Sequence, residues 1–305
     1  MKIVFVVNNK NKRLQNELPG LNKCLEEGEI GLTEILFTTK GKHAIELARE
    51  ATERECDFLI GVGGDGTLHE LINGVLLSNI PSESYPAIGL LPWGSANDFA
   101  RTVGVSNSPD ELIRSIKANS TKKIDLGKIV LHQTKEIRYF INIAGLGLGA
   151  EVVKGMEQTT SRLGPGFNYF KHIITGFFRY SKKEVSCNSG DWKWKGKLLQ
   201  MAVANGRYFG NAICVAPDAV PDDGVFQVVI FGNLSIWDYL KNLRNLKKGT
   251  RIKHSEVHYY KAKEIVLESE EPCGIEADGE YVGILPATIS ILPGAISFLM
   301  PSDSR

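Results

Sequence analysis

The sequence predicts an α/β domain with a parallel sheet, followed by a domain that is mainly an antiparallel β-sandwich. In roughly the first 125 residues, short continuous apolar runs alternate with segments whose apolar residues have helical spacing. After Lys123, strand-like segments follow one another with few helical segments between them. We therefore expect one domain over residues 1–125 and a second over 126–293, and residues 294–305 can return to the first.

The expected strands of the first domain are continuous apolar runs, which is typical of parallel strands buried on both faces. They are Lys2–Val7, Ile35–Thr38, Phe58–Val62 and Ala87–Leu91. The helix-spaced segments between them are Ala44–Ala51 and Leu68–Leu77.

The second domain has a longer series of expected strands. They are Ile124–Leu131, Ile137–Ala144, Leu198–Asn205, Val225–Phe231, Glu264–Leu267, Ile275–Ala277, Tyr281–Leu285 and Thr288–Leu292. Two helical insertions are expected, at Tyr169–Tyr180 and Ser235–Leu246.

Composition narrows the class of protein. The chain has 305 residues, of which 43% are hydrophobic and 23% charged, so it can bury a core. Its net charge of +1 lacks the basic excess of nucleic-acid binders, and no nucleic-acid partner is expected. The five cysteines are scattered without a CxxC pair, which fits a reducing compartment such as the cytoplasm. No run approaches the ~18 apolar residues of a membrane span.

A glycine-rich turn follows the third expected strand, in CDFLIGVGGDGT over Cys56–Thr67. Gly63, Gly64 and Gly66 let the backbone approach a ligand closely, and the helix that begins near Thr67 favours a phosphate at its N-terminus. Asp65 would repel that phosphate unless a metal or a hydroxyl offset its charge. A tight turn without a ligand is the alternative.

A second turn of similar design follows the next strand, in LLPWGSANDFAR over Leu90–Arg101. Gly94 shapes the turn, and Ser95 and Asn97 can form hydrogen bonds. Ligands of parallel α/β sheets collect beyond the carboxyl ends of the strands, where Asp65 and Asp98 both lie. Two carboxylates near a nucleotide suggest Mg²⁺, although Asp98 could simply cap the next helix.

The two turns together resemble the diacylglycerol kinase catalytic family, which includes bacterial soluble lipid kinases and the sphingosine and ceramide kinases. The matching segments are GGDGTLHELING (Gly63–Gly74) and LPWGSANDFAR. GGDGT is shared with NAD kinases, but the second motif is not, and NAD kinases carry an Asn-Glu pair where this chain has Asn73–Gly74. Further matches in order are Ile124–Gly127, Phe140–Ala150, Asn205–Gly210, Pro217–Val225 and Ala277–Glu280.

The resemblance implies a nucleotide-binding first domain and a lipid-substrate second domain. The implied nucleotide-binding residues are Asn8, Thr39, Gly63, Gly64, Asp65, Gly66, Thr67, Gly94, Ser95, Asn97 and Asp98. In the family, the first strand usually ends in Asn-Pro followed by a small residue and Gly. Here Asn8–Asn9–Lys10 stands in that place, which leaves the shape of the first loop open.

The resemblance also implies catalytic and metal-binding residues. Asp278 would be the base that takes the proton of the lipid hydroxyl, and Glu280 would assist it. Asp98 and Asp125 would organise Mg²⁺. A second Mg²⁺ would be bound by Asp223 and the carbonyl groups of Val220 and Val225. Without the resemblance, Asp278–Gly279 reads as a β-turn and Pro217–Val225 as an acidic hairpin loop.

The implied activity is a Mg²⁺-dependent transfer of the ATP γ-phosphate to a lipid hydroxyl, with conversion of diacylglycerol to phosphatidic acid first among the options. A NAD kinase-like small-molecule kinase and a non-catalytic nucleotide- or lipid-binding regulator are the alternatives. We expect a cytoplasmic protein that meets its lipid transiently at a membrane surface. Basic and aromatic residues between Arg162 and Lys183 could rest there, or could form an amphipathic helix with a core face. A homodimer is an option that the resemblance leaves open.

Overall fold

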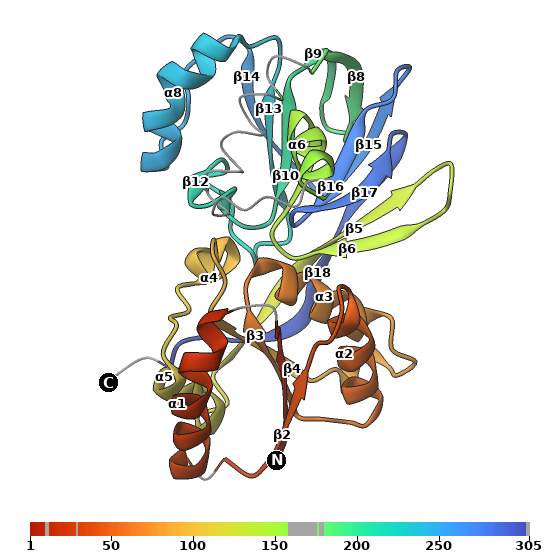
Figure 1. The fold of residues 1–305 in the computed structure, drawn as a ribbon. Coiled ribbons are helices and arrows are strands. Elements are labelled where there is room, and N and C mark those ends of the chain that lie inside the picture. Colours follow the sequence, from red (N-terminus) through yellow and green to blue (C-terminus); the bar gives the residue numbers. More distant parts are fainter. Residues whose placement is uncertain (10–11, 29, 158–175, 177–179, 303–305) are drawn as a thin grey trace. The chain divides into compact units, whose positions relative to one another are not determined.

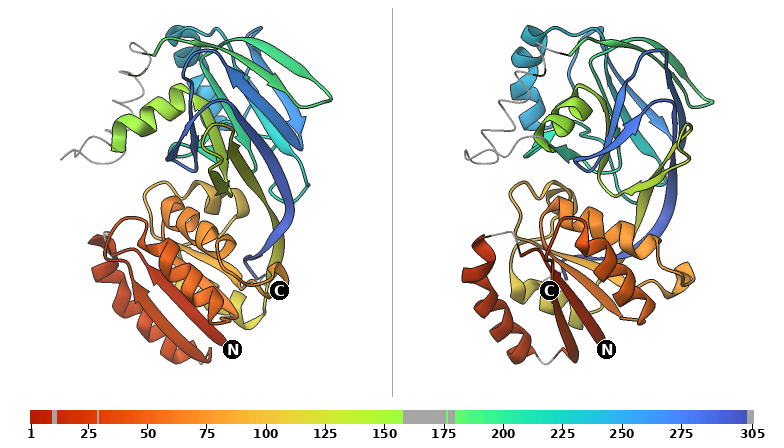
Figure 2. Two further views of the ribbon diagram at one scale, coloured as in Figure 1. Left: turned by 90° about the vertical axis from the view of Figure 1, so that its right-hand side faces the viewer. Right: turned by 45° about the vertical axis from the view of Figure 1, so that its right-hand side comes forward.

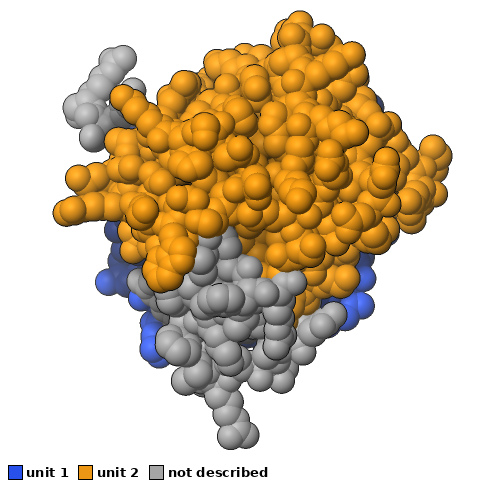
Figure 3. All heavy atoms as spheres, turned by 90° about the horizontal axis from the view of Figure 1, so that it is seen from above, with its two compact units in different colours: residues 1–124, 294–305 blue, residues 125–293 orange. Residues whose placement is uncertain are grey.

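The computed structural model of the chain describes residues 1–9, 12–28, 30–157, 176 and 180–302 (Figure 1). It divides into two compact units, one formed by residues 1–124 and 294–305 and the other by residues 125–293 (Figure 3). The end of the chain thus belongs to the same unit as its beginning.

Unit 1 is built on a parallel sheet in the order β2-β1-β3-β4, with the last part of β18 beside β4. The strands are β1 (Lys2–Val7), β2 (Leu32–Phe37), β3 (Phe58–Gly63), β4 (Ala87–Pro92) and β18 (Ala287–Leu299). Every residue of β3 is buried, because helices cover both faces of the sheet.

The helices of unit 1 form two layers (Figure 2). They are α1 (Lys12–Gly28), α2 (His43–Glu53), α3 (Asp65–Leu76), α4 (Asp98–Val103) and α5 (Pro109–Lys117), together with the short 3₁₀ helix η1 (Ser82–Ser84). Leu21 of α1 and Ile116 of α5 pack on one face of the sheet, in a cluster with Phe5 and Ile60. Helices α2 and α3 lie on the other face.

Unit 2 is a β-sandwich. One sheet is antiparallel and has the order β14-β13-β10-β7-β16-β17. Its strands are β7 (Ile143–Gly147), β10 (Gln200–Ala204), β13 (Phe226–Phe231), β14 (Val257–Ala262), β16 (Gly274–Ala277) and β17 (Glu280–Ile284). The opposing layer contains β5 (Thr121–Leu131), β6 (Ile137–Phe140), β8 (Lys183–Asn188), β9 (Lys193–Leu198), β15 (Glu264–Ser269) and the first part of β18, and β11 (Tyr208–Phe209) pairs with β12 (Ile213–Cys214).

Strand β13 shows why the first of these sheets is buried on both faces. Val228 and Ile230 point into the sandwich core, whereas Val229 and Phe231 belong to a second cluster on the opposite face. This alternation follows from the two-residue period of a strand. Helices α6 (Leu148–Glu157) and α8 (Ile236–Lys248) contribute side chains to the second cluster, so they cover that outer face.

The expected α/β domain followed by an antiparallel sandwich is confirmed, and some details differ. Helices α1, α5 and α6 and strands β8 and β14 were not among the expected elements. The single strand expected over Ile137–Ala144 is divided into β6 and β7. The helix expected at Ser235–Leu246 is α8, with Ser235 as its N-cap. The expected insertion at Tyr169–Tyr180 lies almost entirely outside the described residues.

All five cysteine thiols are free, and four of them are buried. Burial raises the pKa of Cys56 and of Cys273 to about 11 and that of Cys187 to about 12. Among the described helices, none is long and apolar enough to cross a membrane.

Candidate active site

The two glycine turns of unit 1 lie directly against each other. Strands β3 and β4 are neighbours, so their carboxyl ends reach the same edge of the sheet. The Gly94 N–H donates to the Gly63 carbonyl over 3.0 Å. A Cβ on Gly94 would lie 2.3 Å from Gly64 Cα, a distance that real side chains do not adopt. Backbone contact between the turns therefore requires glycine at this position.

Polar side chains fix the shape of the second turn. Asn97 adopts a left-handed conformation, with φ of 52°. Its Oδ1 accepts from Gly94 N at 3.1 Å, and its Nδ2 donates to the carbonyls of Pro92 and Gly94 at 2.9 and 3.0 Å. Ser95 is exposed beside it. The amide of Asn97 thus has a structural function in addition to its predicted contact with the nucleotide.

Asp65 joins the two turns. Its Oδ1 accepts from the Phe99 N–H at 3.1 Å, in the first turn of α4. A carboxylate at a helix N-terminus is stabilised by the unpaired amides and the positive end of the dipole. This backbone donor offsets the Asp65 charge, where the sequence suggested a metal or a hydroxyl. Asp98 lies in the same turn of α4 and is only 4% exposed.

The other residues of unit 1 that were predicted to bind the nucleotide lie near the start of α3 or near the start of α2. Asn8 Nδ2 donates to Thr67 Oγ1 at 3.3 Å, which brings the end of β1 to the start of α3. Thr39 is exposed and bonds to His43 Nδ1 over 3.1 Å from its N–H. Gly66 has open space around it, whereas a Cβ on Gly63 would lie 2.3 Å from Thr67 Oγ1.

Glu70 lies in the matching segment Gly63–Gly74, but nothing in the sequence indicated its role. Its two carboxylate oxygens accept from the N–H groups of Lys42 and Ala44 at 3.2 and 3.0 Å, at the start of α2. The partners are more than 20 residues away in the chain, so no local pattern reveals this contact. On the same helix, a Cβ on Gly74 would lie 2.5 Å from the Ile45 carbonyl oxygen. A larger side chain, such as the Glu of the NAD kinase pair, has no room there.

In unit 2, Asp278 is presented by a two-residue turn between β16 and β17. Asp278 and Gly279 have φ of 50° and 87°, and Ala277 pairs with Glu280 across the turn. Positive φ at both residues is the pattern of a type I′ hairpin, so the predicted β-turn is present.

The Asp278 carboxylate accepts three backbone hydrogen bonds from residues 141–143. Its Oδ2 accepts from Ile141 N at 3.0 Å, and its Oδ1 from Asn142 N at 2.9 Å and Ile143 N at 3.1 Å. These amides face the carboxylate, and this arrangement interrupts the strand that was expected over Ile137–Ala144. The three hydrogen bonds thereby fix the orientation of the Asp278 carboxylate. Glu280 is half-buried at the start of β17.

A second carboxyl group lies below this turn and was also missed. Glu276 is fully buried, and its Oε2 accepts from the Gly279 N–H at 2.8 Å. Its Oε1 has no hydrogen-bond partner among the described residues. Burial is the main cause that raises the pKa of Glu276 to about 8; the Asp278 and Glu280 carboxylates contribute to this rise, and the Gly279 N–H opposes it. Glu276 is therefore protonated at neutral pH.

Glu276→Gln is expected to flatten the dependence of stability on pH. Between its ordinary pKa near 4.5 and the folded value near 8, the unfolded chain releases a proton that the folded chain keeps. The free energy of unfolding of the wild type should therefore fall as pH rises, by up to about 1.4 kcal/mol per unit. Urea unfolding at pH 5, 6.5 and 8 measures the slope. The exposed Glu264→Gln is the control, and equal slopes in both variants would contradict the prediction.

Asp125 holds the acidic loop against β5. Its N–H donates to the Pro221 carbonyl over 2.8 Å, and its Oδ2 accepts from Gly224 N at 2.8 Å. Asn205, the first residue of the matching segment Asn205–Gly210, donates from Nδ2 to the carbonyls of Asp125 and Ile141. Asn205 therefore connects this loop to the segment that holds Asp278.

The predicted second metal site contains a competing cation. Asp223 Oδ2 lies 3.3 Å from Lys261 Nζ, and Asp223 Oδ1 accepts from Val225 N at 3.2 Å. Val220 is 44% exposed. Across the described residues, no three His, Cys, Asp or Glu side chains gather as a metal site. Asp98 belongs to unit 1 and Asp125 to unit 2, so their shared Mg²⁺ stays a prediction.

Comparisons with known proteins identify the family. Residues 2–129 match the diacylglycerol kinase catalytic domain, and residues 143–300 match the YegS C-terminal NAD kinase beta sandwich-like domain. A diacylglycerol kinase of Staphylococcus epidermidis is 30% identical over 274 residues, covering 89% of this chain and 83% of its own. A probable lipid kinase of the YegS-like type from Chromohalobacter salexigens is 28% identical over 98% of this chain and 93% of its own.

The fold agrees with these matches. A crystal structure of a diacylglycerol kinase from Bacillus anthracis str. Sterne superposes with a TM-score of 0.73 at 21% identity, covering 98% of this chain and 96% of that one. Together, the matching catalytic domain and the matching sandwich domain span most of the described residues. The chain therefore belongs to the diacylglycerol kinase family of lipid kinases.

Proposed function

We propose that this protein is an ATP-dependent kinase that transfers the γ-phosphate to the hydroxyl group of diacylglycerol, forming phosphatidic acid. Membership of a kinase family implies ATP as the phosphate donor. The names of the relatives support a lipid acceptor, and the Staphylococcus epidermidis relative is named for diacylglycerol. The proposal assigns the donor to unit 1 and the acceptor to unit 2.

The glycine turns of unit 1 suit a triphosphate. The first-turn amides of α3 have no acceptor within the helix, and they follow a strand that ends in Gly63, with Gly64 as the N-cap. A Cβ at Gly63 would collide with Thr67 Oγ1, and one at Gly94 would collide with Gly64 Cα, so the turns keep this shape only with glycine at both positions. A phosphate at this helix N-terminus is stabilised by hydrogen bonds and by the helix dipole. Asn8 and Thr67 border the same turn.

One observation in unit 2 carries the assignment of the acceptor. Strand β7 begins at Ile143, whose N–H binds the Asp278 carboxylate, and it leads into Leu148, which lines an apolar pocket. The five residues of β7 span roughly 17 Å of extended chain. That distance is comparable with the length of a long acyl chain. A lipid could therefore place its hydroxyl near Asp278 and a tail in the pocket.

The pocket itself is suited to hydrocarbon. It lies on the outer face of the six-stranded sheet and is lined by residues of α6, β10, β11, β12, β13 and α8. Among its lining side chains, only those of Gln200 and Tyr239 carry polar atoms. Binding of an alkyl chain in such an apolar pocket is favourable, because it removes apolar surface from water. A water-soluble acceptor such as NAD would gain nothing from it.

The proposed chemistry requires one proton transfer and one displacement. Asp278 takes the proton of the acceptor hydroxyl, and the oxygen forms a bond to the γ-phosphorus as the bond to the β,γ-bridging oxygen breaks. ADP leaves and the proton passes from Asp278 to solvent. Mg²⁺, when bound by the phosphates with Asp98 or Asp125, would neutralise charge on the leaving group. The protein positions the two substrates and stabilises the charge that develops on the phosphates.

Transfer of labelled γ-phosphate from ATP tests the proposal. The acceptors are short-chain diacylglycerol, ceramide and sphingosine in detergent micelles, and NAD in buffer. We expect product with diacylglycerol, and none when Mg²⁺ is chelated. Product with NAD alone would overturn the lipid assignment. ATP binding without product from any acceptor would favour a non-catalytic regulator.

A further inference from the structure

Helix α8 presents an aromatic side chain and several cations on one exposed face. Trp237 is 70% exposed, the highest value among the exposed aromatic residues of the described chain. Lys241, Arg244 and Lys248 follow it at positions i+4, i+7 and i+11, and all three are exposed. This spacing places the four side chains in one stripe along the helix. We call these four residues the α8 stripe.

The charge of α8 differs from that of the chain as a whole. The helix contains four basic residues and one acidic residue, a net charge of +3, whereas the whole chain has +1. Within the described chain, none of the four basic side chains forms an ion pair with an acid. The single acid, Asp238, is engaged in capping. The cationic face is thus available to an anionic partner.

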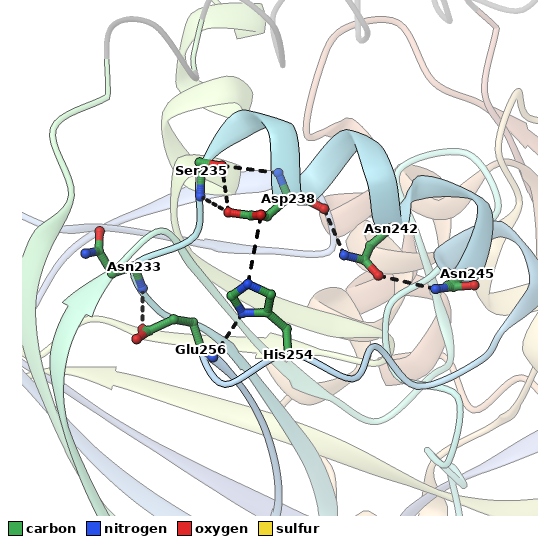
Figure 4. A network of polar contacts seen from close by, with 7 residues as sticks. All are labelled: Asn233, Ser235, Asp238, Asn242, Asn245, His254 and Glu256. Atoms are coloured by element: carbon green, nitrogen blue, oxygen red, sulfur yellow. Dashed lines mark hydrogen bonds and ion pairs between the residues drawn. The ribbon is translucent and has the colours of Figure 1, made fainter.

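A network of polar contacts holds the start of α8 in place (Figure 4). Ser235 and Asp238 form a reciprocal capping box, with Asp238 N donating to Ser235 Oγ at 3.2 Å and Ser235 N donating to Asp238 Oδ2 at 3.0 Å. His254 Nε2 lies 3.9 Å from Asp238 Oδ1. At the other end, Gly249 closes the helix with φ of 67°. The stripe is therefore carried by a fixed helix.

The opposite face of α8 lines the apolar pocket. Tyr239 and Leu246 point away from the stripe and belong to the pocket lining with Phe231 of β13. One face of α8 is therefore exposed to solvent and carries an indole and cations, and the opposite face lines the apolar pocket. An indole ring lies best at the boundary between water and acyl chains, and lysine and arginine bind anionic headgroups.

We propose that the α8 stripe docks this protein on an anionic lipid bilayer, beside the pocket that receives the acyl chain. The inference rests on the proposed lipid kinase function and adds the surface through which the protein reaches its substrate. Strand β9 is the competing basic surface, with Lys193, Lys195 and Lys197 exposed. Its neighbour Trp192 stacks on Tyr260 at 4.2 Å and donates to the Lys261 carbonyl, and Trp194 packs against the sandwich core. Neither indole is available to a membrane.

Vesicle co-sedimentation tests the docking surface without ATP or turnover. We expect the wild type to bind phosphatidylcholine vesicles that contain phosphatidylglycerol, and to bind pure phosphatidylcholine weakly. Trp237→Ala should weaken binding on the order of tenfold, because the variant loses the free energy that the wild type gains when its indole moves from water into the bilayer. The combined Lys241→Glu, Arg244→Glu and Lys248→Glu should weaken it by roughly 100-fold or more.

The β9 surface supplies a control with the same change of charge. Lys193→Glu, Lys195→Glu and Lys197→Glu together should alter vesicle binding by less than about threefold, since screening limits the effect of distant charges. Equal losses in the two triple variants would overturn the proposal, because the interaction would then depend only on net charge. Failure of the wild type to bind anionic vesicles would also overturn it.

Two further measurements separate this proposal from its alternatives. The α8 variants should keep the wild-type turnover of short-chain diacylglycerol in detergent, where no bilayer is needed. Loss of that turnover would show that the stripe acts in folding or chemistry instead of docking. Light scattering should give the same mass for wild type and Trp237→Ala; a smaller mass for the variant would identify α8 as an interface between copies of the chain.

Discussion

Asp278→Asn is expected to lower kcat on the order of 10³-fold, because an amide cannot take the proton of the acceptor hydroxyl. The substitution also disturbs the turn. Asn presents one oxygen and one NH₂ group where Ile141, Asn142 and Ile143 donate three N–H bonds to two oxygens. ATP affinity should be unchanged, since the glycine turns belong to unit 1. Calorimetry with an ATP analogue and phosphate-transfer assays separate the two quantities.

Asp191→Asn provides the matched control. Asp191 is exposed in the loop between β8 and β9, so the same change of charge should leave kcat at the wild-type value. Thermal unfolding of both variants shows whether the turn alone accounts for the loss. Full turnover by Asp278→Asn would mean that the carboxylate only organises residues 141–143 and that another group is the base.

Gly94→Ala is expected to reduce ATP affinity by roughly 100-fold or more, an effect comparable with the cost of a 1 Å misplacement in a positioned site. The added Cβ would meet Gly64 Cα at 2.3 Å and Gly64 N at 2.8 Å. Both are backbone atoms, so no side chain can turn aside, and the turns must separate. The hydrogen bond that the Phe99 N–H donates to Asp65 Oδ1 would be strained by the same movement. Calorimetric titration with ATP measures the affinity.

Gly66→Ala is the control for stability in the same motif. A Cβ on Gly66 meets nothing within 4 Å, so its melting temperature should match the wild type, whereas Gly94→Ala should melt earlier. If Gly66→Ala loses ATP affinity without a change in melting temperature, the added methyl group collides directly with a phosphate of ATP. Wild-type affinity in Gly94→Ala would contradict the assignment of the nucleotide to these turns.

The buried parallel strands could be predicted from the sequence because their apolar runs are continuous. Lys2–Val7 has the predicted bounds, and Phe58–Val62 and Ala87–Leu91 are each one residue short. Helix α1 could not be predicted in this way, because Pro19 and Gly20 read locally as a turn. Packing of Leu21 and Leu25 in the core compensates for that unfavourable local sequence.

Site residues could be predicted from the sequence where they lie in a short local motif. Their contacts with residues that are distant in the sequence could not be predicted. Asp65 and Asn97 lie in short motifs, but the contact of Asp65 with Phe99 depends on the pairing of β3 with β4. The donors to Asp278 precede it by more than 130 residues. Glu276 carries no local signal either, since its protonation follows from burial below the turn.

The protonated native thiols have a practical consequence for optical work on α8. A thiol-reactive dye attacks the thiolate, and burial keeps Cys56, Cys187 and Cys273 in the thiol form at neutral pH. Only Cys24 is partly exposed, and its pKa is also raised. A cysteine placed at position 237 would therefore accept a polarity-sensitive label ahead of the native residues, and its emission would follow arrival at a lipid surface in real time.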